Sequence, residues 1–141
     1  MSHPPRADAK LPLPRVLDVG NCDADHGRIR QFLTTNFECE IDRVMFIDEA
    51  RAQLAARQFA LVLVNRLIFA DATPGLPLVD LVQALPPERR PAVMLISNYD
   101  DAQAEAVARG ALPGFGKAAL GTPDAKARLA TVLPPRTARR A

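Results

Sequence analysis

The chain alternates short apolar runs with segments in which apolar residues recur every three or four positions. Runs such as Phe59–Val64 and Val93–Ile96 are typical of strands buried on both faces of a sheet. The segment that holds Ile29, Phe32 and Leu33 places a single apolar stripe on a helix. Strands that alternate with helices imply right-handed crossovers. The pattern therefore predicts an α/β protein with a doubly wound, five-stranded parallel sheet and five helices.

The boundaries of these elements follow from local signals. Strands are expected at 16–19, 38–46, 59–64, 93–96 and around 115. Asp23 or Asp25 is expected to cap the first helix. Thr122 is expected to cap the last helix, with Pro123 at its first position, and Gly110 is expected to end the fourth helix.

Prolines mark both ends of this pattern. We expect a disordered, proline-rich tail over 1–14, a single domain over 15–133 and a basic tail over 134–141. The longest apolar run is too short to span a bilayer, and Cys22 and Cys39 lack metal-ligand spacing. We therefore expect a cytoplasmic protein without a membrane partner.

The net charge of +2 belongs to the two ends of the chain. Residues 1–14 contribute +1 and residues 134–141 contribute +3, which leaves −2 for the domain between them. A domain with this balance lacks the broad basic face that gathers phosphates. Nucleic-acid binding through the folded body is therefore not expected.

Polar residues follow four of the predicted strands: Gly20 with Asn21, then Asn65, Ser97 and Lys117. Ligands gather at the carboxyl ends of strands in doubly wound sheets, so the residues that follow the strands are the place to look for a site. Their order and spacing resemble the receiver domain of bacterial response regulators, across 15–133. The resemblance places these five residues in the phosphoacceptor pocket, which we take as the candidate site. The resemblance implies the CheY-like, flavodoxin-like three-layer sandwich and a place in two-component signal transduction and phosphorelay.

The resemblance also shows what is missing. In receivers the first strand ends in two acids that hold magnesium, where this chain has Gly20 and Asn21. The third strand ends in the aspartate that accepts phosphate, where this chain has Asn65. Only the hydroxyl, at Ser97, and the lysine, at Lys117, are retained. Magnesium prefers carboxylate oxygens and an aspartyl phosphate needs a carboxylate nucleophile, so we expect magnesium binding and phosphorylation to be lost.

This departure favours a degenerate receiver, or pseudo-receiver, that acts by phosphorylation-independent protein–protein interaction and is not an enzyme. Receivers dock partners through the fourth helix, fifth strand and fifth helix. The corresponding residues here are Ala102, Ala106, Arg109, Lys126 and Arg128. The partner is expected to be a signalling protein, and the sequence leaves a homodimer open.

Two other functions stay open. In the first, Asp23, Asp25 or Asp71 accepts a phosphoryl group as a displaced acid. In the second, the neutral-to-positive pocket binds a small anion, covered by the long loop from Asn65 to Gly75. Structural roles are also open: Lys117 is expected to reach Asn65 or Asp23, and a buried Asp18 needs a polar partner.

Overall fold

The computed structural model describes residues 12–137, and its centre is one parallel sheet. The strands run in the order β2-β1-β3-β4-β5, so the chain reverses its direction of travel across the sheet after β2. The predicted doubly wound sheet is confirmed. The strands are β1 (Arg15–Val19), β2 (Glu40–Val44), β3 (Leu61–Asn65), β4 (Ala92–Ile96) and β5 (Leu112–Phe115).

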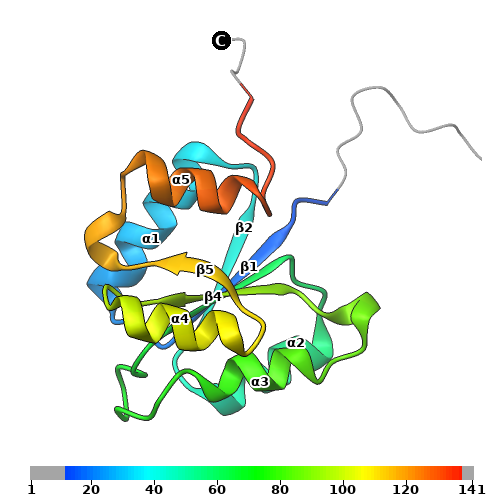
Figure 1. Ribbon diagram of the computed structural model, residues 1–141. Helices are drawn as coiled ribbons and strands as arrows, with labels where there is room; N and C mark the ends of the chain where they lie inside the picture. The colour runs from blue at the N-terminus through cyan, green and yellow to red at the C-terminus, as the bar shows by residue number, and fades with distance from the viewer. Residues whose placement is uncertain (1–11, 138–141) are drawn as a thin grey trace, which may run out of the picture.

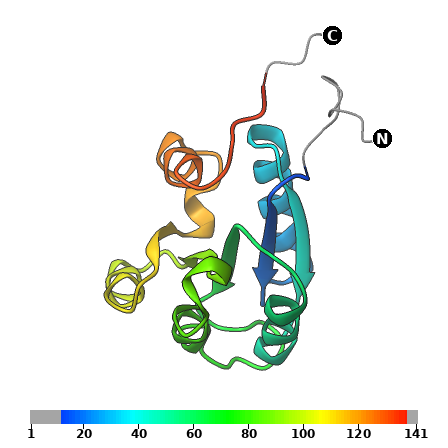
Figure 2. The ribbon, with the colours of Figure 1, turned by 90° about the vertical axis from the view of Figure 1, so that its right-hand side faces the viewer.

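Helices cover both faces of the sheet (Figures 1 and 2). They are α1 (Asp23–Asn36), α2 (Ile47–Ala56), α3 (Pro77–Gln83), α4 (Asp100–Ala108) and α5 (Pro123–Ala130). Helices α1 and α5 lie on one face, and α2, α3 and α4 lie on the other (Figure 1). Alternate strand residues therefore enter two separate cores, with Leu61 and Leu63 in one and Val62 and Val64 in the other.

The helix boundaries follow the predicted signals at α5 but not at α1. The hydroxyl of Thr122 accepts a hydrogen bond from the backbone N–H of Ala125 at 3.3 Å, as expected for an N-cap. At α1 the N-cap is Cys22, and its side chain makes no capping bond. Asp23 and Asp25 lie in the first turn instead, where carboxylates still interact favourably with the positive end of the helix.

The segment just after residue 133 pairs with the end of α1. The N–H of Glu38 donates to the carbonyl of Pro134 at 3.0 Å, and the N–H of Arg136 donates to the carbonyl of Asn36 at 2.9 Å. Ordered hydrogen bonding thus extends into the predicted basic tail. The rest of that tail and nearly all of the predicted amino-terminal tail lie outside the described residues. No helix within residues 12–137 has the length and apolarity to cross a membrane.

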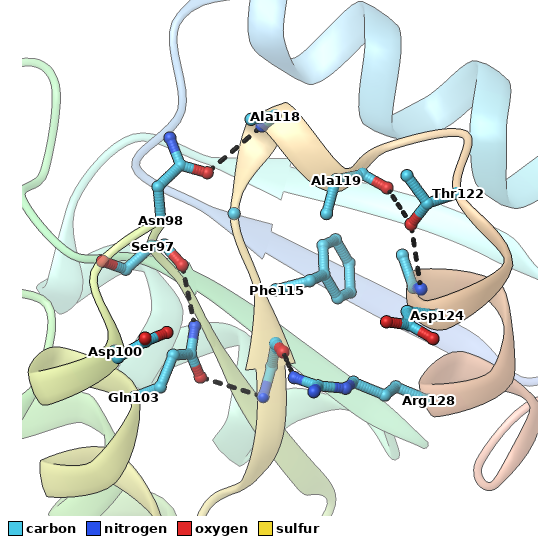
Figure 3. A pocket seen from close by; sticks show the side chains of 13 residues that line it. Ser97, Asn98, Asp100, Gln103, Phe115, Ala118, Ala119, Thr122, Asp124 and Arg128 are labelled. Atoms are coloured by element: carbon cyan, nitrogen blue, oxygen red, sulfur yellow. Dashed lines mark hydrogen bonds between the residues drawn. The ribbon is translucent and has the colours of Figure 1, made fainter.

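Strand β5 is attached to β4 partly through a side chain. The Gln103 amide on α4 donates to the carbonyls of Leu95 and Ser97 at 2.9 and 3.1 Å. Its oxygen accepts from the N–H of Gly114 at 2.9 Å (Figure 3). The register between β4 and β5 is irregular at this point, so Gln103 satisfies backbone groups that the ladder leaves unpaired.

Candidate functional site

The end of β1 is closed by an apolar side chain. Gly20 has φ +81°, and a Cβ added there would lie 2.4 Å from the Cδ1 of Ile68. Ile68 is fully buried, and the N–H of Phe69 donates to the carbonyl of Gly20 at 2.8 Å. The backbone conformation and the contact with Ile68 both require glycine at this position. Ile68 therefore blocks the space in which a side chain at position 20 would lie.

Asn21 points into the protein rather than toward the other candidate residues. Its amide donates to Asp18 Oδ1 at 2.6 Å, and the other carboxylate oxygen of Asp18 lies 2.6 Å from His26 Nδ1. Asp18 and Asn21 are both fully buried beneath the start of α1. The partner that a buried Asp18 requires is thus the pair Asn21 and His26.

Arg43 closes the outer side of this buried group. Its guanidinium donates to the carbonyl of Asn21 at 2.8 Å and forms an ion pair with Asp23, also at 2.8 Å. Asp18 and Arg43 are neighbours in the β1–β2 register, so the two strands supply both charges to one small region. Asn21 is therefore held by its side chain and by its backbone.

The segment that carries Ile68 is a compact loop, residues 66–76, between β3 and α3. A bridge joins Leu67 to Pro74, and the N–H of Ile68 donates to the carbonyl of Thr73 at 2.8 Å. Asp71 accepts from both the N–H and the hydroxyl of Thr73, and these bonds lower the pKa of the Asp71 carboxyl. These internal bonds fix the shape of the loop and so the position of Ile68.

The remaining three candidate residues do meet. Asn65, Ser97 and Lys117 line a cavity of about 250 Å³ at the ends of β3, β4 and β5. Gly20 touches this group only through its carbonyl, which accepts from the Asn65 amide at 3.1 Å. The hydroxyl of Ser97 accepts from the N–H of Tyr99 at 3.1 Å, so its proton is free to donate.

Lys117 pairs with an acid that the sequence analysis did not select for it. Its ammonium lies 2.8 Å from Asp25 Oδ2, whereas Asp23, the expected partner, pairs with Arg43. Asp25 also accepts from the Cys22 thiol at 3.3 Å. The hydrogen bond from Lys117, opposed by partial burial, lowers the pKa of the Asp25 carboxyl.

The predicted docking residues are not a continuous exposed surface. Ala106 is fully buried, so its place in the predicted surface is wrong, and Ala102 is only partly buried. Arg109 pairs with Asp80 on α3 and with Glu105, each at 3.1 Å. An alanine fits either face of a helix, so helical period could not separate exposed alanines from buried ones.

Lys126 and Arg128 lie on the exposed side of α5. Figure 3 shows the neighbouring groove of about 480 Å³, which runs between α4 and α5 over β5 with Phe115 at its centre. Gln103 and Arg128 reach Gly114 from opposite sides of this groove, and Arg128 donates to its carbonyl. Arg128 therefore stabilises the position of β5. Lys126 is exposed, so it can contact another molecule.

Several solved structures share this fold. The receiver domain of a DNA-binding response regulator from Colwellia psychrerythraea matches with TM-score 0.69 and 19% identity, covering 84% of this chain and 96% of that one. A CheY-like receiver domain from Methylobacillus flagellatus matches with TM-score 0.63 and 23% identity, covering 85% and 95%. The fold is that of a receiver domain.

NtrX from Brucella abortus matches as well, with TM-score 0.59, 24% identity and 70% of this chain covered. The match spans only 22% of the NtrX chain, so it concerns one domain of a longer protein. No family model and no curated protein matches the sequence. The receiver likeness therefore lies in the backbone, while the residues at the strand ends have diverged.

The magnesium ion that receiver domains use does not fit these residues. Gly20 offers no side-chain oxygen and is covered by Ile68, and the Asn21 side chain is bonded to Asp18. Within residues 12–137, no three histidine, cysteine, aspartate or glutamate side chains come together as a metal site. Two of the residues that border the cavity, Arg66 and Lys117, carry positive charge, and Lys117 is paired with Asp25.

Proposed function

We propose that this protein is a pseudo-receiver that acts in signal transduction by phosphorylation-independent binding to a protein partner, and that it is not an enzyme. The receiver fold supports a signalling role by analogy with the solved receiver domains. The loss of the acidic residues at the strand ends supports a role without phosphorylation. A receiver without chemistry still offers its surface to other proteins.

The observation that carries this proposal is the contact between Ile68 and Gly20. Glycine at position 20 offers no side-chain ligand, and Ile68 also fills the space that a side chain at this position would occupy. Phosphoryl transfer depends on the metal to offset charge on the transferred group. An aspartate introduced at position 20 would clash with the buried side chain of Ile68.

The remaining polar groups cannot replace this chemistry. The amide of Asn65 is a poor nucleophile, and its N–H already donates to the carbonyl of Gly20. The three acids considered as displaced acceptors are also engaged: Asp23 with Arg43, Asp25 with Lys117, and Asp71 with Thr73. In each of them one carboxylate oxygen is engaged, which makes the carboxylate a weaker nucleophile than a free one.

Incubation with acetyl phosphate and magnesium tests the proposal. We expect no covalent mass increase in the intact protein and no change in thermal stability on addition of magnesium alone. A stoichiometric increase of one phosphoryl group on any aspartate would overturn the proposal. Mapping that group to Asp23, Asp25 or Asp71 would support the displaced-acid function instead.

Two reconstructed variants serve as controls. The first carries Gly20→Asp, Asn21→Asp and Asn65→Asp, and the second carries the same changes with Ile68→Ala. We expect magnesium to stabilise the second variant more than the first, because only the second has room for the ion. Equal magnesium stabilisation of both variants would show that Ile68 is not what excludes the ion.

A further inference from the structure

A second groove, separate from the one in Figure 3, runs between the 66–76 loop and the start of α4. It encloses about 580 Å³. Its walls carry Leu67 and Pro74 from the loop, Leu76 from the start of α3, and Tyr99 and Ala102 from the start of α4. The side chains of Leu67 and Tyr99 are 40% and 58% exposed, which is unusual for large apolar groups beside each other.

One end of this groove opens onto the cavity of Asn65, Ser97 and Lys117. Arg66, Leu67 and Tyr99 border both spaces, so the two form a continuous surface. The cavity is lined by two cationic side chains, Arg66 and Lys117, and the Lys117 ammonium is already paired with Asp25 at 2.8 Å. An apolar groove therefore leads to a cavity in which Arg66 supplies the charge available to a ligand.

Arg66 is held ready to bind at the junction. Its guanidinium carbon lies 4.9 Å from the centre of the Tyr99 ring, a stacking distance for an arginine on an aromatic face. Within residues 12–137, no carboxylate forms an ion pair with Arg66. A fixed planar donor with no acid beside it is suited to a carboxylate from another molecule.

The opposite wall of the groove has the reverse charge. Asp101 and Glu105 border it on α4, and Glu105 is already paired with Arg109 at 3.1 Å. An acidic group is thus attracted at the Arg66 end and repelled at the α4 wall. This polarity would fix the direction in which a bound segment lies.

We propose that this groove docks an acidic, apolar segment of a protein partner. A carboxylate of the segment binds Arg66, and a bulky apolar side chain beside it packs on Leu67, Leu76 and Tyr99. Apolar contact area next to Arg66 favours a protein segment, because a small free anion would leave the groove uncovered. The proposal rests on the proposed function and adds the site and the chemistry of the partner.

Selection of peptides from a random displayed library tests this proposal on the 141-residue chain. We expect selected peptides to share an aspartate or glutamate next to leucine, isoleucine or phenylalanine. Their synthetic forms should bind at least tenfold more weakly to Arg66→Glu, and about threefold to tenfold more weakly to Tyr99→Ala. The matched control is Lys126→Glu, an equal charge reversal at an exposed lysine on α5, which should leave the affinity unchanged.

Circular dichroism establishes that each variant keeps its fold before affinities are compared. Selected peptides without an acidic residue, or peptides that bind Arg66→Glu as tightly as the parent, would overturn the groove. So would binding that Lys126→Glu abolishes, because the partner would then lie on the α5 side. None of these outcomes tests whether the protein is phosphorylated. The proposed function is tested separately, by the acetyl phosphate experiment.

Discussion

The two halves of the carboxyl edge of the sheet have diverged in opposite ways. At β1, Gly20 is covered by Ile68, and Asn21 turns toward Asp18. At β3, β4 and β5 the edge is still hollow, with Ser97 and Lys117 on the wall of a cavity. The half that would hold a cation is filled, and the half that would hold an anion is open. The two halves of one sheet edge therefore differ in whether they leave a cavity.

The filled half should be the more sensitive to substitution. Gly20→Asp places a side chain on a residue with positive φ, against Ile68, and buries a carboxylate. Backbone strain and overpacking together should lower the free energy of unfolding by about 4 kcal/mol, measured by urea denaturation. The double variant with Ile68→Ala should recover part of this loss. Simple addition of the two single effects would show that Gly20 and Ile68 are not coupled.

Removal of the buried carboxylate should have the next largest effect. Asp18→Ala leaves the amide of the fully buried Asn21 and Nδ1 of the partly exposed His26 without their partner. We expect a loss of about 3 kcal/mol in the free energy of unfolding. The variant His26→Ala should cost less, since the His26 side chain is partly exposed. An Asp18→Ala protein of unchanged stability would mean that the bonds from Asp18 to Asn21 and His26 do not stabilise the fold.

The open half should tolerate change. Asp25→Asn removes the ion pair with Lys117, whose side chain is 29% exposed, and should cost about 1 kcal/mol or less at neutral pH. Because the pKa of Asp25 in the folded protein lies below its ordinary value of 3.8, the stabilisation is present above that value. It should disappear as the pH falls through the lower folded pKa. A difference between the two proteins that persists below that pH would contradict the ion pair as its cause.

The five strands and the doubly wound sheet were predictable because hydrophobic periodicity is a local property of the sequence, whereas the CheY-like arrangement came only from the resemblance to receiver domains. The need of Asp18 for a polar partner was also visible, but not that Asn21 and His26 supply it. Which residues bind Asp18 depends on how α1 packs over β1, and the spacing of residues in the sequence does not predict that packing.

The role of Ile68 could not be predicted for a related reason. An apolar residue in a loop can be exposed, as Leu67 is, or fully buried, as Ile68 is. The difference in burial follows from the hydrogen bonds inside the 66–76 loop, and the sequence does not show which residues these bonds join. The same holds for Ala106, whose burial depends on the rotation of α4 about its axis.

Gln103 has a consequence for motion in this molecule. Its single side chain spans from α4 to carbonyls of β4 and its end, and to the N–H of Gly114 on β5. Movement of α4 away from the sheet therefore breaks two hydrogen bonds to β4 and its end, and breaks the bond to β5 unless the edge strand moves with it. Binding of a partner to the first turn of α4 would therefore displace β5, the edge strand, through Gln103. This coupling does not involve Gly20.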